Sequence, residues 1–330
     1  MRTLVLSVKP CENAARPGCG ATVGGVDKLR VLVTGGAGFV GSHVVEALLA
    51  RGDEVTVADD LSTGDRRNVA AAADLRVVDI SDGDAIVREL GDLDLDAIVH
   101  AAAEASVVRS VADPARSERV NVGGTANVLE LAKRAGASRF VFFSTGGAIY
   151  GETAVCAKET DPLRPVSPYG KHKLEGEKLV QLSGLSHAIL RPANIYGPRQ
   201  RGDLEGGVVA IFMQRWRARQ ELVVFGDGSA ERDYVYVEDV ARAVVAALER
   251  AGNGNWNIGT GVLTSVNAVV NALRQYLGPP PAGVRFAPPR AGELQRACVD
   301  PSKAARDGFW RPTVSFVAGI GLLLAEAKLG

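Results

Sequence analysis

The first half of the chain alternates between short apolar runs and longer stretches in which apolar residues recur every three or four positions. Residues 29–34 form the first run, and Val40, Val44 and Leu48 follow at a spacing of four, which places them on one face of a helix ending near Arg51. Strands that alternate with helices predict an α/β fold with a doubly wound parallel sheet. The further apolar runs expected to be buried strands lie at 54–58, 75–78, 97–101, 139–144 and 187–191.

The pattern changes at residues 192–198, which contain two prolines and a glycine. Beyond them the predicted elements are shorter and less regular, which indicates a second, smaller and irregular α/β domain. Its expected helices lie at 207–217, 237–250, 265–277 and 316–328, and its expected strand at 222–225.

A glycine-rich turn separates the first predicted strand from its helix. Gly35, Gly38 and Gly41 follow the G-x-x-G-x-x-G spacing. Gly35 permits a tight turn, Gly38 allows a pyrophosphate to approach the backbone, and Gly41 lets helix and strand pack closely. The amides at the start of the helix then face the phosphates, so the stretch predicts dinucleotide binding.

The second strand ends at Asp59, about twenty residues after the glycines. A carboxylate there accepts hydrogen bonds from the adenosine ribose hydroxyls and repels a 2′-phosphate, which favours NAD over NADP. Arg66 and Arg67 follow a few residues later, and we expect them to be solvated loop residues.

Tyr169 and Lys173 are four residues apart in the predicted helix 167–183, so their side chains share a face. Lowering a tyrosine pKa from about 10 to about 7 requires roughly 4 kcal/mol. One ammonium about 4 Å away supplies energy of that order at an effective dielectric constant near 20. We therefore expect Lys173 to lower the pKa of Tyr169 and make it a general base, with a positive nicotinamide ring adding to the effect.

The glycine motif together with Tyr169-x-x-x-Lys173 resembles the extended short-chain dehydrogenase/reductase family, over residues 28–328. Residues 34–41 and 59–64 are most similar to its NAD-dependent UDP-hexose 4-epimerases. The resemblance implies a Rossmann NAD-binding domain at 28–193 and a mainly UDP-sugar-binding domain at 194–330, with some segments returning to the first domain. Residues 1–27 are expected to be a flexible extension.

The resemblance also implies which residues contact NAD. Lys173 would hold the nicotinamide ribose as well as assist Tyr169, and Asn121 would brace the backbone of the site. Asp79 can instead be read as a helix cap with Ser81 and Asp82. The implied cofactor contacts are Gly35, Gly38, Phe39, Val40, Asp59, Asp60, Leu61, Ser62, Gly64, Asp79, Ile80, Ala101, Ala102, Ala103, Tyr169 and Lys173.

The family places a serine or threonine after the fifth strand to bind the sugar oxygen that is oxidised. Gly146 occupies the usual position in this chain, which departs from the pattern. We therefore assign the hydroxyl to Thr145, with Ser144 as the alternative.

The implied substrate contacts include two arginines, which suit phosphate oxygens because a guanidinium binds them with two parallel hydrogen bonds. Ala297 is small where the epimerases limit the sugar pocket, which would admit a bulkier or N-acetylated sugar. The implied set is Ser144, Thr145, Asn194, Val224, Phe225, Arg232, Arg290 and Glu293, with Val224 and Phe225 beside the uracil and Glu293 on the uridine ribose.

The composition excludes several other functions. Lysine plus arginine and aspartate plus glutamate both number 38, so no net field favours nucleic acid or an anionic membrane. No apolar run reaches membrane-spanning length. The four histidines show no ligand spacing, and we expect no metal. The four scattered cysteines fit a reduced protein of the cytoplasm.

These observations predict an NAD-dependent enzyme that inverts C4 of a UDP-sugar of the UDP-glucose/UDP-galactose type through a 4-keto intermediate. The main alternative is a UDP-glucuronate 4-epimerase, for which Arg191 or Arg109 could bind the carboxylate. A nucleotide-sugar 4,6-dehydratase lacks support because Gly146 and Gly147 stand where its acidic pair belongs. A non-catalytic NAD-binding protein would not need Tyr169 and Lys173. The resemblance further suggests a homodimer through the helices at 114–135 and 167–183; otherwise their outer faces are solvated.

Overall fold

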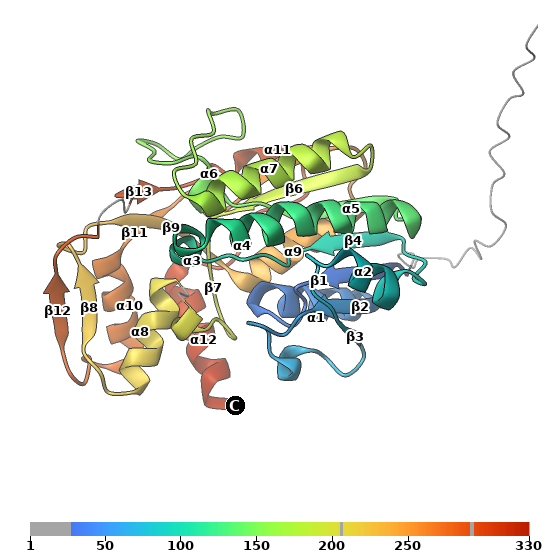
Figure 1. Cartoon of the computed structure of the whole chain (residues 1–330). Helices are drawn as coiled ribbons and strands as arrows, with labels where there is room; N and C mark the ends of the chain where they lie inside the picture. Colours follow the sequence, from blue (N-terminus) through green and yellow to red (C-terminus); the bar gives the residue numbers. More distant parts are fainter. Residues whose placement is uncertain (1–27, 205–206, 291–293, 330) are drawn as a thin grey trace, which may run out of the picture.

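A seven-stranded parallel sheet forms the centre of the larger lobe (Figure 1). The computed structural model describes residues 28–204, 207–290 and 294–329. The strand order is β10-β6-β5-β4-β1-β2-β3, and every neighbouring pair is parallel. The predicted doubly wound sheet is therefore confirmed. Its strands are β1 (Arg30–Thr34), β2 (Glu54–Asp59), β3 (Asp74–Val77), β4 (Ala97–His100), β5 (Arg139–Phe143), β6 (Ser186–Pro192) and β10 (Gly254–Ile258).

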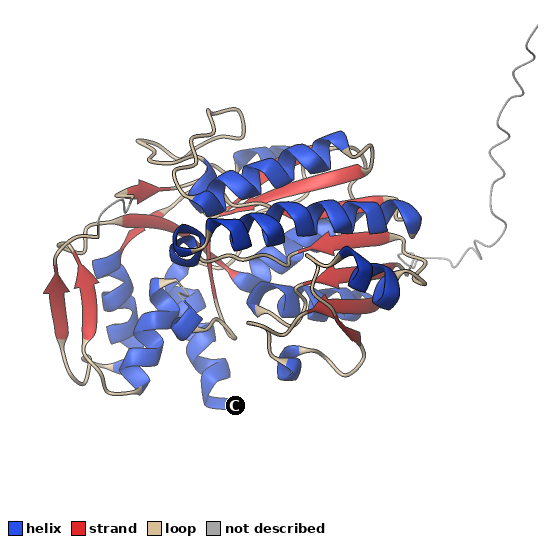
Figure 2. Cartoon of the chain, viewed as in Figure 1, coloured by secondary structure: helices blue, strands red, loops and turns tan. Residues whose placement is uncertain are grey.

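Helices cover both faces of this sheet, because each face presents branched aliphatic side chains that must be buried (Figure 2). The helices α1 (Phe39–Arg51) and α9 (Val237–Glu249) pack on one face. The helices α2 (Gly83–Leu90), α5 (Gly124–Arg134) and α7 (Pro168–Leu182) pack on the other. The helix α11 (Ser302–Arg306) lies against β10.

The predicted helix at 114–135 is interrupted. It consists of α4 (Pro114–Glu118), a π-turn η2 (Arg119–Gly123) and α5, preceded by the short helix α3 (Val107–Ala112). The π-turn contains Asn121, whose amide clamps the backbone of Glu104 through two hydrogen bonds of 3.0 Å. A π-turn inside a helix often lies at a functional site, and this one braces the segment after β4.

The smaller lobe has its own core around Tyr196, Phe212, Trp216, Tyr236 and Leu273. The predicted helices and the strand of this half are all present. Segments β10 and α9 belong to the larger lobe's sheet and its covering layer. The remaining elements of the smaller lobe are β7 (Asn194–Tyr196), η3 (Gly202–Leu204), α8 (Val208–Arg217), β8 (Leu222–Phe225), β9 (Glu231–Tyr236), β11 (Leu263–Ser265), α10 (Val266–Leu277), β12 (Val284–Ala287), β13 (Arg296–Ala297) and α12 (Phe316–Leu329). The larger lobe also contains the short helices η1 (Arg66–Asn68) and α6 (Gly146–Ile149).

A disulfide joins Cys156 to Cys298 across 142 residues of sequence. The expectation of reduced cysteines is therefore wrong for this pair. The spacing along the chain gave no signal, because the two residues come together only when residues 156–158 pair with the segment after β13: Ala157 donates to the carbonyl of Cys298 at 2.9 Å, and Asp300 donates back to Ala157 at 2.7 Å. No helix within the described residues is long and apolar enough to cross a membrane.

Candidate active site

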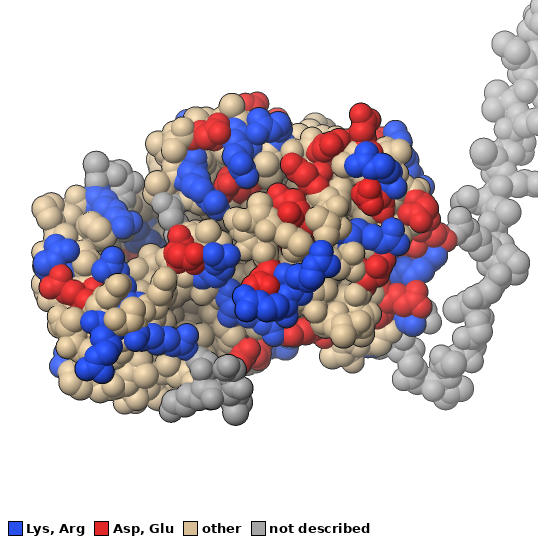
Figure 3. All heavy atoms as spheres, turned by 60° about the horizontal axis from the view of Figure 1, so that its bottom comes forward, with Lys and Arg blue, Asp and Glu red and all other residues tan. Residues whose placement is uncertain are grey.

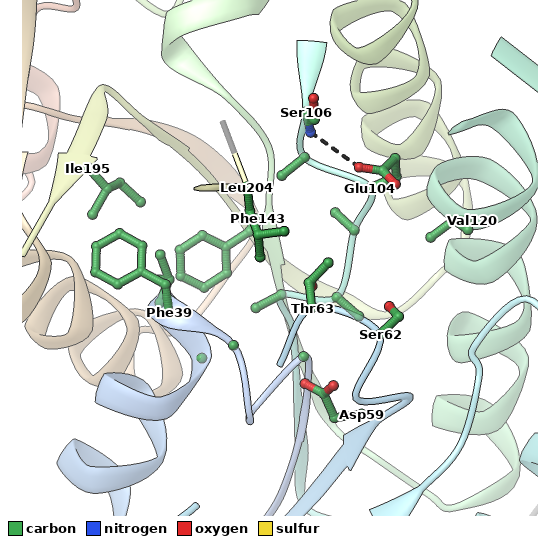
Figure 4. A pocket seen from close by; sticks show the side chains of 18 of the residues that line it. Phe39, Asp59, Ser62, Thr63, Glu104, Ser106, Val120, Phe143, Ile195 and Leu204 are labelled. Atoms are coloured by element: carbon green, nitrogen blue, oxygen red, sulfur yellow. Dashed lines mark hydrogen bonds between the residues drawn. The ribbon is translucent and has the colours of Figure 1, made fainter. Parts of the chain in front are cut away.

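A cavity of about 470 Å³ opens at the carboxyl ends of the central strands, where ligands bind in open α/β sheets (Figure 4). Phe39, Asp59 and Ser62 come from the elements around the glycine turn, and Glu104 and Ser106 come from the segment after β4. Ile195 of β7 and Leu204 of η3 also line the cavity.

The glycine turn forms the floor of this cavity. Gly35 has a φ of 72°, and a Cβ atom there would lie 2.6 Å from the backbone nitrogen of Ala102. Only glycine therefore allows the turn to contact the end of β4 this closely. Gly35 donates to the carbonyl of Ala58 at 2.7 Å, which ties the turn to β2.

The carboxylate of Asp59 lies beside this turn and is buried. It accepts hydrogen bonds from the backbone of Ala37 at 3.0 Å and of Leu61 at 2.9 Å. Burial raises its pKa, and these backbone donors oppose the rise. A Cβ atom on Gly64 would lie 2.7 Å from the Asp59 carboxylate, so the loop 60–64 fits closely over it.

Most residues predicted to contact the dinucleotide line this cavity. Leu61 and Gly64 do not line it. The Leu61 amide donates to the Asp59 carboxylate, and Gly64 lies against that carboxylate. The residue that caps α2 is Asp82, whose carboxylate accepts from the Ala85 amide at 3.0 Å. Asp79 does not cap this helix; its carboxylate accepts from the Ser81 amide at 2.8 Å. The lining members of the predicted set are Gly35, Gly38, Phe39, Val40, Asp59, Asp60, Ser62, Asp79, Ile80, Ala101, Ala102, Ala103, Tyr169 and Lys173.

Helix α7 brings Tyr169 and Lys173 to the same cavity. Ser167 caps the helix by accepting from Gly170 at 3.1 Å, and Pro168 occupies its first turn. The Lys173 ammonium lies 4.3 Å from the centre of the Phe142 ring. The shared face predicted from the four-residue spacing is therefore present.

The predicted lowering of the Tyr169 pKa by Lys173 is wrong. Burial raises the pKa of Tyr169 to about 12, and a hydrogen bond with Thr145 only partly opposes it. Burial also lowers the pKa of Lys173 to about 7, against the favourable charge of Glu177. The loss of water around both groups therefore outweighs the attraction between a phenolate and an ammonium.

The three residues that directly follow β5 decide which hydroxyl groups lie near Tyr169. Thr145 bonds to Tyr169, while the Ser144 hydroxyl is buried, lines the cavity and has no hydrogen-bond partner. A Cβ atom on Gly146 would lie 2.6 Å from Cγ1 of Val299 and 2.9 Å from the carbonyl oxygen of Arg191. The usual hydroxyl position therefore has no room for a side chain in this protein.

The predicted substrate residues are only partly brought together. Asn194 lines the cavity with Ser144 and Thr145, whereas Val224, Phe225, Arg232 and Arg290 do not. Val224 is buried, the Arg290 guanidinium stacks 3.9 Å from the centre of the Phe225 ring, and Arg232 donates to the carbonyl of Glu231 at 2.9 Å. Glu293 lies outside the described residues. Ala297 is buried in β13.

Several lining residues were not identified from the sequence. Glu104 is buried and pairs with Arg109 at 2.9 Å and with Arg116 at 3.7 Å. Arg199 and Gln200 line the cavity from the segment after β7, and each carries a buried polar atom without a hydrogen-bond partner. Isolated polar residues carry no spacing signal, and only the position of 199–201 a few residues after Asn194 could have indicated Arg199 and Gln200. Basic and acidic side chains are interspersed over the face in Figure 3, in keeping with the equal charge totals.

The cavity fits an NAD molecule on three observations. The glycine turn leaves no space for side chains, the buried Asp59 carboxylate lies at the end of β2, and the unpartnered Ser144 hydroxyl lies in the same cavity as Tyr169. Among the described residues no group of three potential metal ligands occurs. Fold and site together define a dinucleotide-dependent enzyme of the short-chain dehydrogenase/reductase class.

Comparisons with known proteins identify the family within this class. Residues 31–259 match the model of the NAD dependent epimerase/dehydratase family. UDP-glucose 4-epimerase of Mycolicibacterium smegmatis is 41% identical over 303 residues, covering 88% of this chain and 96% of the relative.

Two solved structures are similar over 91% of this chain. UDP-glucose 4-epimerase of Thermotoga maritima with UDP-glucose is 40% identical, with a TM-score of 0.87 over 100% of its length. UDP-glucose 4-epimerase of Thermus thermophilus with NAD is 43% identical, with a TM-score of 0.85 over 99% of its length. The chain belongs to the NAD-dependent epimerase/dehydratase family, and its cofactor is NAD.

Proposed function

We propose that this protein inverts C4 of UDP-glucose and UDP-galactose. The observation that carries the proposal is the convergence of Tyr169, Thr145 and Lys173 with Asp59 in one cavity. The names of the relatives with 40–43% identity support the same reaction. We retain the division into an NAD-binding domain at 28–193 and a mainly UDP-sugar-binding domain at 194–330 as part of this proposal.

NAD supplies the group that accepts the C4 hydride and returns it to the opposite face of the 4-keto sugar. Tyr169 removes the proton of the 4-hydroxyl and later gives it back. Thr145 orients the reacting oxygen, with the Ser144 hydroxyl as a second donor beside it. Lys173 holds the nicotinamide ribose and provides positive charge, and Asp59 binds the adenosine ribose.

The electrostatics favour Tyr169 as a base more strongly when oxidised NAD would be bound beside it. Moving the pKa of Tyr169 from about 12 to about 7 requires roughly 7 kcal/mol. Each unit positive charge about 4 Å away contributes on the order of 4 kcal/mol at an effective dielectric constant of 20. The value of about 12 already holds with Lys173 in place, so a positive charge on bound NAD at that distance would lower the pKa of Tyr169 by about three units, towards neutral pH.

UDP anchors the substrate while the sugar turns. In this proposal Arg232 and Arg290 bind the phosphates, Asn194 contacts the diphosphate, and Val224 and Phe225 flank the uracil, with Glu293 on the uridine ribose. Binding energy concentrated on UDP leaves the hexose free to present either face to the cofactor. The small Ala297 side chain admits N-acetylated sugars as additional substrates.

A UDP-glucuronate 4-epimerase is the second candidate. Arg191 does not favour it, because its guanidinium is buried in an ion pair with Glu177. Arg109 does favour it, because this residue lines the cavity and remains partly exposed. A 4,6-dehydratase is disfavoured because Val299 and two backbone carbonyls surround the position of Gly146.

We further propose a homodimer that buries α4, α5 and α7 together with the exposed Val107, Val108 and Val111 of α3. We also propose a cytoplasmic location. The Cys156–Cys298 disulfide counts against this location, since disulfides are rare in reducing compartments such as the cytoplasm. The oxidation state of this pair in freshly lysed cells tests it.

The substrate test is a direct comparison of UDP-sugars. UDP-glucose, UDP-glucuronate and their N-acetyl counterparts are incubated separately with the enzyme, and the C4 epimers are resolved by chromatography. The proposal expects UDP-galactose from UDP-glucose, with NAD co-purifying with the protein. Conversion of UDP-glucuronate alone would favour the second candidate, and no conversion of any of them would exclude both.

A further inference from the structure

A fully buried ion pair joins Glu177, which lies on α7 one turn beyond Lys173, to Arg191 on β6. The Arg191 guanidinium binds the Glu177 carboxylate at 2.8 Å and 2.6 Å, and the two side chains are 3% and 2% exposed. Burying two charges is costly, and a paired replacement by apolar residues often preserves stability. Stability alone therefore gives a weak reason for this pair.

The position of Glu177 gives a better one. Glu177 follows Lys173 by four residues in α7, so both side chains lie on the same face. Burial works against the Lys173 ammonium, and the Glu177 carboxylate is the charge that favours it. His100 on β4 also interacts with Lys173, but burial lowers its pKa to about 3, so it is neutral near pH 7. Tyr169 is the remaining titratable group of α7 in the cavity.

Arg191 is itself fixed from two other segments. It donates to the Tyr150 hydroxyl at 2.9 Å and to the carbonyl of Glu159 at 3.5 Å. The Tyr150 hydroxyl donates in turn to the Asn257 amide oxygen at 2.8 Å, and the backbone of Asn257 donates to the Glu159 carboxylate at 2.8 Å. The network therefore extends from β10 through Arg191 to Glu177, and holds that carboxylate in one orientation.

We propose that Glu177, fixed by Arg191, is a positioning residue that keeps the Lys173 ammonium charged while Tyr169 acts as the base. The inference rests on the proposed function, because that function gives Lys173 its role. Glu177 touches neither substrate nor cofactor in this scheme and acts through Lys173. Lys173 has a pKa of about 7 with Glu177 in place, so without Glu177 it would be protonated in a smaller fraction of molecules near pH 7.

The test titrates Lys173 directly in the NAD-loaded enzyme. Protein with ¹³C-labelled lysine is followed by NMR from pH 5 to pH 11, and the Lys173 resonance is identified by its absence in Lys173→Met. In Glu177→Gln the Lys173 pKa is expected to fall by roughly one unit or more. The alkaline limb of the kcat/KM profile should move to lower pH by the same amount. Glu177→Asp keeps the charge and should largely restore both values.

Two further variants separate this role from a structural one. Glu175→Gln removes an exposed carboxylate of the same helix, which pairs with Lys178 at 3.0 Å, and should change neither measurement. Glu177→Met combined with Arg191→Met removes the pair without leaving a buried arginine, and should still lower the Lys173 pKa.

An unchanged Lys173 titration in the double variant or in Glu177→Gln would overturn the inference, even if the maximal rate fell. The NMR titration needs no substrate, so it is independent of whether UDP-glucose is converted. Failure of the proposed function would instead be seen as a wild-type enzyme that does not interconvert UDP-glucose and UDP-galactose.

Discussion

Replacing Gly146 by alanine tests why this chain lacks the usual hydroxyl residue. The added Cβ atom would lie 2.6 Å from Cγ1 of Val299 and 2.9 Å and 3.0 Å from the carbonyl oxygens of Arg191 and Pro192. Contacts this short force the neighbours to move. Two of the three neighbours are backbone atoms of Arg191 and Pro192 in β6, which pair with β10 in the sheet.

The expected cost follows from overpacking. Inserting a methyl group into a filled site costs about 1–3 kcal/mol, and the gain of up to about 1 kcal/mol from replacing a helical glycine offsets part of it. Val299→Ala removes the shortest contact but leaves both carbonyls. We therefore expect Gly146→Ala to lower the free energy of unfolding by about 1–2 kcal/mol, with a favourable coupling of about 1 kcal/mol to Val299→Ala.

The assay is denaturant unfolding of the wild type, both single variants and the double variant at one fixed NAD concentration, because bound NAD adds to stability. Gly123→Ala is the matched control, since a Cβ atom there meets nothing within 4 Å. Equal stability of Gly146→Ala and Gly123→Ala, with no coupling to Val299→Ala, would refute the packing explanation.

Three further predictions follow from the site and its surroundings. Tyr169→Phe should retain NAD and UDP binding by calorimetry but lose turnover by at least about 100-fold, because it removes the general base; near-normal turnover would remove Tyr169 from the mechanism. Replacing both Cys156 and Cys298 by serine should lower the free energy of unfolding by up to about 5 kcal/mol, because the loop-entropy model assigns this much to a bond that closes 142 residues. An unchanged melting temperature under oxidising conditions would argue against the bond. In the folded protein the Lys173 pKa is lowered from 10.5 to about 7. Between pH 7 and pH 10.5 the unfolded chain therefore holds a proton on Lys173 that the folded protein has lost, so the free energy of unfolding should rise with pH across this window. Lys173→Met should abolish this rise, and a wild-type curve parallel to that of the variant would contradict the assignment.

The sequence was sufficient for the larger lobe because its signals are local. The β1 run, the glycine spacing and the Val40, Val44 and Leu48 stripe each determine a neighbouring element, and the structure has all of them. The predicted proximity of Tyr169 and Lys173 likewise follows from helical spacing alone. The individual site roles that the resemblance implies stay predictions.

Other features depend on contacts between distant segments. The disulfide forms because residues 156–158 pair with the chain after β13. The pKa values of Tyr169 and Lys173 are set by burial that many segments create together. The pair of Glu177 and Arg191 joins α7 to β6, so neither residue shows its role in the sequence.

The fate of the C4 hydrogen tests the proposed reaction most directly. UDP-glucose carrying deuterium at C4 is converted in ordinary water, and the UDP-galactose formed is analysed by mass spectrometry and NMR. Direct hydride removal and return predicts that deuterium remains at C4 and that no solvent hydrogen enters. Loss of the label to water would show that C4 is deprotonated rather than oxidised, and would contradict the role of NAD beside Tyr169.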